Sequence, residues 1–421
     1  MRNSDHSPGA RPDRISGRPA GGSAVRRSLL KYLAAPIRTD WRPLTRELSR
    51  FDVTAFLVTM LLLATGVVFI HSTGSQIGSR AAMSFWEKQL IWIAAGMGGY
   101  FITARLDYRK LIPWSAVFYP VALALLVTVL FFGKKVNGAT SWINLGLFQL
   151  QPSEFAKLAV ILFLAALHSS ALFKIRKIGH ILLSLAVLAV PAALIASEPD
   201  FGSAAVLVPI GMVMIFAAGL NRRLILVALA ISAVVAGALI ANEVLEVRPL
   251  LKDYQRERIL VFLNPERDLA RRGYNAYQSR LAVGSGGWLG KGIGQGTQNL
   301  LGFLPQSVSN NDFIFSVLAE ETGFVGAMLL LLGYVILLYT VLRTAFLAQD
   351  HFAQQIGIGF ATLIFVHLFI NIGMSVGLMP ITGLPLPLLS YGGSFVVSML
   401  LGLGLMQSIY RRNRIIQEEE Q

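Results

Sequence analysis

The chain has 421 residues, of which 54% are hydrophobic and only 14% are charged. A soluble domain carries about 25% charged residues, so this composition excludes an ordinary water-soluble fold and indicates a protein that folds in a lipid bilayer. The net charge of +14 lies in an N-terminal tail and in short segments between apolar runs, which is typical of contact with an anionic membrane and not of nucleic-acid binding. Cysteine is absent, which excludes disulfides, thiolate metal sites and cysteine nucleophiles.

Residues 1–50 are rich in Arg, Pro, Gly and Ser, and they predict a disordered, basic cytoplasmic tail. A helix needs about 20 apolar residues to cross the hydrocarbon core of a membrane. Such runs follow the tail and predict an all-α polytopic integral membrane protein with about ten transmembrane helices in a domain at 51–410. The runs lie at 51–72, 87–104, 111–132, 153–168, 179–196, 201–220, 223–243, 313–342, 355–378 and 391–410.

Basic residues in the short loops set the predicted orientation. With the tail inside, the basic residues that fall on the cytoplasmic side are Arg105, Arg109, Lys110, Lys174, Arg176, Lys177, Arg222, Arg223, Arg411, Arg412 and Arg414. This distribution satisfies the positive-inside rule and places both termini in the cytoplasm, including a C-terminal tail at 411–421. The polar, Gly-rich segment 244–311, between the seventh and eighth runs, is then one large extracytoplasmic loop, long enough to be exempt from the charge rule.

Familiar catalytic motifs do not fit this sequence. The stretch from Gly284 to Gly292 is not a phosphate-binding P-loop, because Ser285 stands where its first Gly belongs and Gly292 where Ser or Thr is needed. The six His residues have no metal-ligand spacing. His168 and His367, in or beside spans, are interpreted as packed or interfacial residues.

Polar residues at the outer ends of spans are costly in lipid and are therefore the candidates for function. The first such cluster, at the start of the fourth run, contains Gln151, Pro152, Ser153, Glu154 and Lys157. Pro152 and Ser153 suit the first turn of a helix. Glu154 and Lys157 are three residues apart and share a helix face, either as an ion pair that stabilises the helix end or, as we prefer, facing a substrate.

The second cluster, Glu198-Pro199-Asp200, lies between the fifth and sixth runs. Two carboxylates flank a proline that interrupts the helix. We prefer a structural interpretation, in which Asp200 caps the next helix, over a role in substrate binding.

The third cluster lies in the long loop. Glycines allow a backbone to approach a ligand closely, and Arg matches the oxygens of a pyrophosphate. The alternative is that these charges only solvate an exposed loop. The candidate substrate-binding residues of this loop are Arg256, Arg258, Tyr274, Gln278, Ser279, Ser285, Gly286 and Lys291.

The fourth cluster, Asn311-Asp312-Phe313, stands where the loop meets the eighth run. An acid at the entrance of an apolar helix is partly desolvated, which raises its pKa and makes it a usable general base. Asp is also a favoured N-cap residue, and on the residues alone capping is the preferred interpretation.

At these clusters the chain resembles the SEDS family, the shape, elongation, division and sporulation proteins. The motifs that carry the resemblance are Gln-Pro-Ser-Glu at 151–154, Glu-Pro-Asp-Phe-Gly at 198–202, Tyr-Asn-Ala-Tyr-Gln-Ser at 274–279, Gly-Ser-Gly-Gly at 284–287, Asp-Phe-Ile-Phe at 312–315, and Gly-Leu-Pro-Leu-Pro at 383–387 leading to Ser390, Tyr391 and Gly392. Glycines and polar residues at 290–298 and Pro-Ile-Thr-Gly at 380–383 favour the RodA branch over the FtsW branch. The chain departs from the family pattern between Pro305 and Phe313, where a short Pro-Glu-x-His-Thr-Asp run is usual and this chain has a longer segment without the His or the Glu. It also departs at Phe395, where a Ser is more usual.

The resemblance implies a peptidoglycan glycosyltransferase of the bacterial inner membrane. It implies that Asp312 is the essential acid, that Glu154 and Lys157 belong to the site, and that Glu198, Asp200 and the segment Ser390–Gly392 have structural or partner-binding roles. The implied substrate is lipid II, the implied partner is a class B penicillin-binding protein, and a divalent cation such as Mg or Mn is an allowed cofactor. The alternatives are a division-specific FtsW-type polymerase, a lipid II flippase and a non-catalytic scaffold.

Overall fold

The computed structural model describes residues 49–74, 84–136, 139–144, 146, 149–173, 175, 177–244, 253–263 and 272–420. The predicted disordered tail lies almost wholly outside these residues. The first five long helices are α3 (Val53–Thr73), α4 (Ser84–Arg105), α5 (Leu111–Phe132), α6 (Pro152–Ser169) and α7 (Ile178–Ser197). The others are α8 (Phe201–Ala217), α9 (Arg222–Val244), α14 (Ile314–Phe346), α15 (His351–Ser375) and α16 (Gly393–Glu419).

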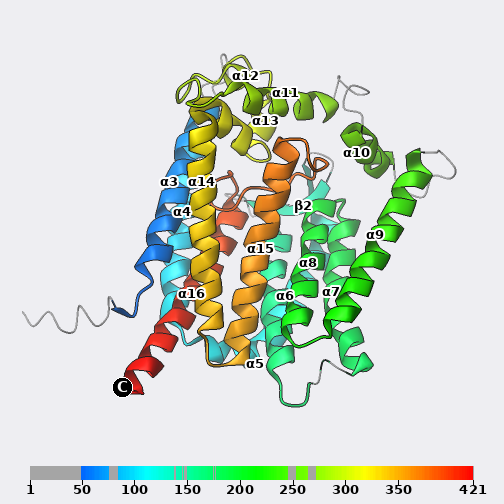
Figure 1. The fold of residues 1–421 in the computed structure, drawn as a ribbon, viewed down its shortest axis with the longest axis vertical. Coiled ribbons are helices and arrows are strands. Elements are labelled where there is room, and N and C mark those ends of the chain that lie inside the picture. The colour runs from blue at the N-terminus through cyan, green and yellow to red at the C-terminus, as the bar shows by residue number, and fades with distance from the viewer. Residues whose placement is uncertain are drawn as a thin grey trace, which may run out of the picture. The chain divides into compact units, whose positions relative to one another are not determined.

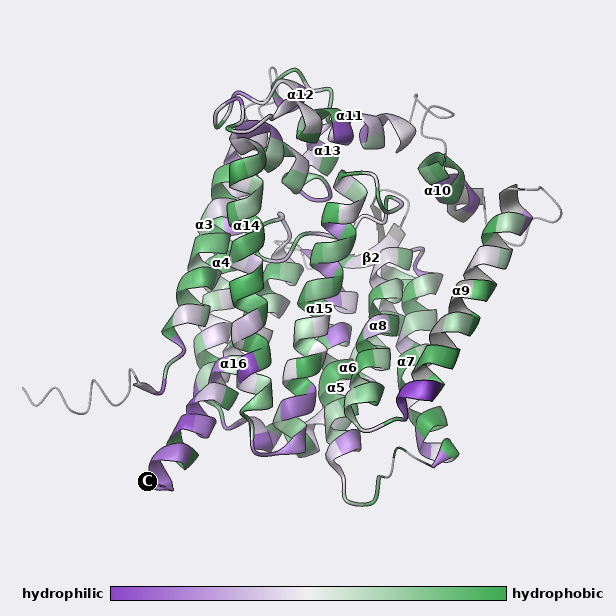
Figure 2. Ribbon diagram, viewed as in Figure 1, coloured by the Kyte–Doolittle hydropathy of each residue, from purple (hydrophilic) through white to green (hydrophobic). Residues whose placement is uncertain are grey.

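Each of the ten predicted apolar runs coincides with one of these helices. Among the described residues, seven helices are long and apolar enough to cross a membrane, and α8 is a shorter apolar helix. The predicted class, an all-α polytopic membrane protein, is therefore confirmed. Figure 2 shows hydrophobic residues along most of each long helix, with hydrophilic residues toward the C-terminal part of α16 and on the helices of the long loop.

Helix α15 occupies the middle of the bundle (Figure 1). It packs against α14 on one side and against α6 and α8 on the other. Helices α3, α4, α14 and α16 form one group, in which α16 packs against α4 and α14 packs against α3. Helices α5, α6, α7 and α8 form the other group. Because α15 joins the two groups, polar side chains on its faces can contact residues that are distant in the sequence.

The predicted loop 244–311 contains helices that the sequence did not predict: α10 (Asp253–Leu263), α11 (Arg272–Ser285), α12 (Thr297–Leu300) and α13 (Gln306–Ser309). In Figure 1, α11–α13 cross one end of the bundle and α10 lies beside them. We call this end the loop end. A 3-10 turn, η1 (Tyr108–Lys110), precedes α5.

Three short strands, also not predicted, connect α5 to α6. They are β1 (Lys134–Val136), β2 (Ala139–Asn144) and β3 (Gln149–Leu150), in the antiparallel order β1-β2-β3. In the register, Lys134 is opposite Trp142, and Ile143 is opposite Leu150. Strand β3 leads directly into α6, so the sheet fixes where the Gln-Pro-Ser-Glu motif begins.

Candidate active site

The backbone around Asp312 is held by the end of α15 and by the buried segment that precedes α16. The carbonyl of Asp312 accepts a hydrogen bond from the Asn371 side-chain amide at 2.9 Å. The Asn311 carbonyl accepts one from the Ser390 hydroxyl at 2.6 Å, and the Asn310 carbonyl accepts one from the backbone N–H of Tyr391 at 2.9 Å. Three consecutive carbonyls are thus bound, and the position of the Asp312 side chain is set by a rigid support.

The Asp312 carboxyl group is half-buried at the loop end, and no described residue forms a hydrogen bond with it. Helix α14 begins after Phe313 without a side-chain capping bond, so the capping interpretation of Asp312 is not what the structure shows. Burial raises the pKa of the Asp312 carboxyl to about 6, with the Arg258 charge opposing and the Asp200 charge adding to the shift. A carboxyl group with this pKa is ionised at neutral pH and can still accept a proton readily.

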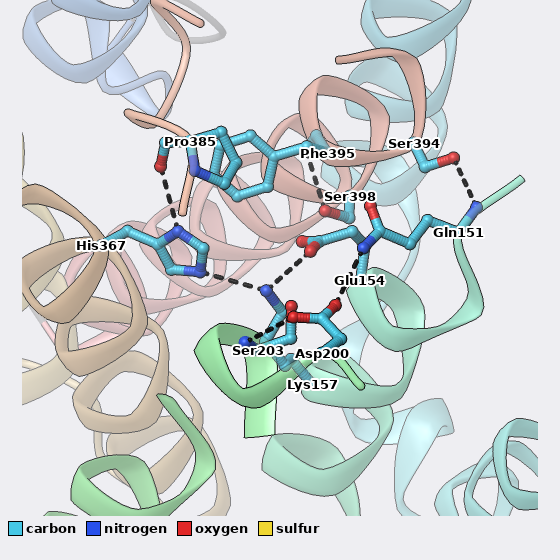
Figure 3. A network of polar contacts seen from close by, with 10 residues as sticks. All are labelled: Gln151, Glu154, Lys157, Asp200, Ser203, His367, Pro385, Ser394, Phe395 and Ser398. Atoms are coloured by element: carbon cyan, nitrogen blue, oxygen red, sulfur yellow. Dashed lines mark hydrogen bonds and ion pairs between the residues drawn. The ribbon is translucent and has the colours of Figure 1, made fainter. Parts of the chain in front are cut away.

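A buried ion pair lies deeper in the bundle. Lys157 Nζ is 2.8 Å from Glu154 Oε1, and the two side chains are 0% and 2% exposed. The two residues therefore share a face of α6, as predicted. They form an ion pair with each other, which was the alternative to the preferred substrate-facing arrangement. Figure 3 shows a third group in contact with the ammonium: His367 Nε2, at 3.0 Å.

The contacts of His367 determine its tautomer. Its Nδ1 is 3.1 Å from the carbonyl oxygen of Pro385, which can only accept, so Nδ1 carries the proton. Nε2 is then the acceptor for the Lys157 ammonium, and the imidazole is neutral. The ring of Phe395 stacks on His367 at 4.8 Å and lies 5.7 Å from Lys157 Nζ. Phe395, the departure from the family pattern, therefore covers the ion pair.

Lys157 is placed in the interior and not at the surface. Its ammonium has three contacts: the Glu154 carboxylate, the His367 ring nitrogen and the Phe395 ring face. Glu154 Oε2 and the Ser153 hydroxyl are also buried, and neither has a hydrogen-bond partner within the described ranges. In this structure these residues form a polar layer below the loop end.

Gln151 connects the start of α6 to the start of α8. Its side-chain amide donates to Asp200 Oδ2 at 3.2 Å, and its backbone N–H donates to the Ser394 hydroxyl at 3.0 Å. Asp200 Oδ1 accepts from the backbone N–H of Ser203 at 3.0 Å, so Asp200 is the N-cap of α8, as predicted. Asp200, in the second cluster, therefore has a structural role.

Glu198 is fully buried, and neither of its carboxyl oxygens has a partner among the described residues. Burial raises the pKa of its carboxyl group to about 8, and the nearby Asp200 charge adds to the shift. A raised pKa means that the folded protein binds this proton more tightly than the unfolded chain does. The contribution of Glu198 to stability is therefore greatest at acidic pH and is lost as the pH rises through about 8.

We expect Glu198→Gln, which keeps the shape and is always neutral, to remove this pH dependence. The measurement is thermal unfolding of the detergent-solubilised protein at pH 5, 7 and 9. The variant should gain stability relative to the unsubstituted protein as the pH increases. An equal pH dependence of the two proteins would contradict a buried, proton-binding Glu198.

The Gly-rich part of the long loop is attached to α14 by hydrogen bonds and by close backbone packing. Lys291 Nζ donates to Glu320 Oε1 at 2.6 Å and to the Ser285 hydroxyl at 2.8 Å. Gly286 packs directly against the backbone of Ala319, where a side chain would collide with the Ala319 carbonyl. In this structure Lys291 pairs with a buried carboxylate, and its contacts secure the loop.

Of the other predicted loop residues, Arg256 and Arg258 are half-buried on α10, and Tyr274 and Gln278 are half-buried on α11. Ser279 is buried and bonds to the Ser316 hydroxyl at 2.6 Å. The remaining predicted segment, before α16, is also placed: the Ser390 hydroxyl accepts from the Leu386 N–H at 2.8 Å, and the N–H of Gly392 donates to Gln89 Oε1 at 3.2 Å.

A pocket at the loop end is lined by two arginines and by apolar side chains. Its walls include Arg258, Phe262, Arg280, Met374, Met379 and Ile381. Sequence reasoning missed Arg280, His367 as a partner of Lys157, and Asn371. The sequence held one signal for two of these residues. His367 and Asn371 are four residues apart, which places them on the same face of a helix.

Comparisons with known proteins show the family to which the chain belongs. The family described as "Cell cycle protein", that of FtsW, RodA and SpoVE, matches residues 52–415. The chain is 36% identical over 368 residues to the peptidoglycan glycosyltransferase MrdB of Escherichia coli K12, covering 87% of this chain and 95% of that one. It is 33% identical over 437 residues to the peptidoglycan glycosyltransferase RodA of Treponema pallidum, covering 87% and 99%.

A solved structure described as "Structural coordination of polymerization and crosslinking by a peptidoglycan synthase complex" superimposes with a TM-score of 0.72 at 31% identity, covering 86% of this chain and 98% of that one. The match therefore spans nearly the whole of each relative and includes all four polar clusters. The chain belongs to the SEDS family of FtsW, RodA and SpoVE proteins.

Proposed function

We propose that this protein polymerises lipid II, an undecaprenyl-pyrophosphate-linked disaccharide peptide, into glycan strands on the outer side of the bacterial inner membrane. It is a peptidoglycan glycosyltransferase, as its relatives MrdB and RodA are named. The observation that carries the proposal is the Asp312 carboxyl group: half-buried, without a described hydrogen-bond partner, and near enough to Arg258 for the arginine charge to act on its pKa.

In this proposal Asp312 removes the proton from the 4-hydroxyl of the acceptor sugar. The oxygen attacks the anomeric carbon of the growing lipid-linked chain from the face opposite the leaving group. The bond to undecaprenyl pyrophosphate breaks, and an α-linked donor becomes a β-linked glycan. The proton stays on Asp312 until solvent removes it, and the rigid support of residues 310–312 keeps the base in place.

The leaving pyrophosphate needs positive charge near it, because its own charge increases as the bond breaks. We assign that charge to Arg258, which lines the loop-end pocket, and to Arg256 on the same helix. The described residues contain no group of three or more His, Asp or Glu side chains that could hold a metal ion. A divalent cation held by the substrate would add to the charge of these arginines.

The positions of the basic loops support the proposed orientation. The C-terminal end of α16, the part of the helix that contains Arg411, Arg412 and Arg414, lies away from the loop end (Figure 1). The turn η1, which contains Arg109 and Lys110, packs against α16. The positive-inside rule then places this end in the cytoplasm and the loop end with Asp312 outside. The N-terminal tail is proposed to be cytoplasmic as well.

A class B penicillin-binding protein is the proposed partner. The support is the solved structure of a complex that coordinates polymerisation and crosslinking. This chain resembles one chain of that complex, and the match covers 86% of this chain. The RodA-like passages at 290–298 and 380–383 favour a role in cell elongation over division.

Purified protein incubated with labelled lipid II, with and without its partner, tests the proposal. Glycan polymer on a gel is the expected result. Movement of lipid II across liposomes without any polymer would instead support the flippase, and neither activity would support the scaffold.

We expect the rate of polymerisation to fall as the pH drops through about 6, because Asp312 is protonated below its pKa and cannot act as a base. The measurement is the initial rate between pH 5 and 8 at saturating lipid II. A rate that is unchanged from pH 7 to pH 5 would be inconsistent with a carboxylate base.

A further inference from the structure

Arg280 lines the loop-end pocket together with Arg258. Arg280 comes from α11 and Arg258 from α10, so two separate helices each contribute an arginine to the wall of one pocket. The remaining walls are apolar, with Phe262, Met374 and Met379 among them. A pocket that combines two arginines with an apolar wall suits an anion that carries a hydrocarbon chain.

The side chain of Arg280 is half-buried and has unused hydrogen-bonding capacity. Its Nε donates to the carbonyl of Ala276, one turn earlier in α11, at 3.3 Å. Within the described part of the chain it makes no ion pair and no other hydrogen bond. The two terminal nitrogens of the guanidinium are thus available, and they are the atoms that bind phosphate oxygens in pairs.

The neighbours of Arg280 fix where its arm runs. Gly377 has a φ of +81°, and a Cβ at this position would lie 2.7 Å from Arg280 Cδ, so glycine leaves room for the arm. The preceding residue, Ser279, is buried and donates to the Ser375 carbonyl at 3.0 Å while bonding to Ser316 at 2.6 Å. These bonds attach α11 to both α14 and α15, which holds Arg280 in a defined position.

We propose that Arg280 binds the diphosphate of a polyprenyl-linked substrate or product, together with Arg258. The proposal rests on the proposed function and assigns a specific residue to its anionic group. Arg258 also interacts electrostatically with Asp312, so the diphosphate is bound next to the base. The first isoprene units contact the apolar wall, and the two arginines hold the phosphate oxygens.

The test measures binding to the full-length protein in detergent, in an Asp312→Asn background that separates binding from catalysis. The probe is farnesyl diphosphate, compared with farnesyl monophosphate and inorganic pyrophosphate. We expect Arg280→Ala to weaken farnesyl diphosphate binding roughly 10- to 100-fold, the loss typical of a charge-assisted hydrogen bond. Arg280→Lys should lose less, because it keeps the charge but not the paired geometry.

The matched control is Arg343→Ala, which removes one guanidinium from the far part of α14, where it lies over the Tyr410 ring. This variant should bind the probe as the parent protein does. Equal probe affinity for the parent and Arg280→Ala, or an equal loss in Arg343→Ala, would overturn the proposal. If Arg280→Ala does not fold, full affinity in Arg280→Lys together with an unchanged preference for diphosphate over monophosphate would do so.

The comparators separate the sources of binding. Binding of inorganic pyrophosphate as tightly as farnesyl diphosphate would show that the apolar wall contributes nothing and would overturn the lipid assignment. Normal polymerisation by Asp312→Asn protein would reject the proposed function instead, whatever the result for Arg280.

Discussion

Replacing Asp312 by Asn is expected to lower glycan polymerisation by a factor of about 10²–10⁴, the usual contribution of a positioned general base. Asn has nearly the same shape, and the hydrogen bonds around residue 312 involve its backbone carbonyl, so the fold should be retained. What is lost is the ability to accept a proton. The measurement is polymer formed from labelled lipid II by equal amounts of folded protein.

The control for this experiment is Asp107→Asn. Asp107 is an exposed residue that caps the 3-10 turn before α5, and Asn caps as well as Asp does. This variant should polymerise normally. Glycan synthesis by Asp312→Asn at a rate close to that of Asp107→Asn would reject the assignment of the base.

Lys157→Met is expected to destabilise the protein by about 3–5 kcal/mol, because it leaves the Glu154 carboxylate buried without its partner. The ammonium also donates to His367 Nε2, which would lose its donor in the same step. The free energy of unfolding in detergent, with chemical denaturant, measures the effect. Polymerisation should decrease in parallel, since α6 and α15 both support the loop end.

The double variant Glu154→Gln/Lys157→Met separates the loss of an ion pair from the loss of packing. It removes both charges, and we expect it to recover most of the stability, since a neutral pair of similar volume is often tolerated in place of a buried ion pair. Two results would show that the buried charges are not coupled. One is a Lys157→Met protein with the same free energy of unfolding as the parent, and the other is a double variant that is less stable than Lys157→Met.

The sequence predicts features that depend on local spacing. Apolar runs predict the long helices because lipid requires them, and Pro152 predicts the start of α6. The three-residue spacing of Glu154 and Lys157 predicts a shared face, and Asp200 before an apolar helix predicts its N-cap. Each of these features depends on residues that are close together in the sequence.

Features that depend on distant partners were not predicted. The contact between Lys157 and His367 joins residues 210 positions apart, and the one between Asp312 and Asn371 joins residues 59 apart. The sequence shows the charge of Lys291 but not that Glu320 binds it. Strands β1–β3 are too short for an alternating pattern, and α10–α13 lie in a polar segment whose helices lack the long apolar runs of the spans.

The side of the membrane on which residue 312 lies is the most direct test of the proposed mechanism. The natural chain contains no cysteine, so Asp312→Cys introduces a single thiol that can be labelled without background. A membrane-impermeant maleimide added from outside should label it. Labelling only from the cytoplasmic side would contradict an outward-facing base that receives lipid II.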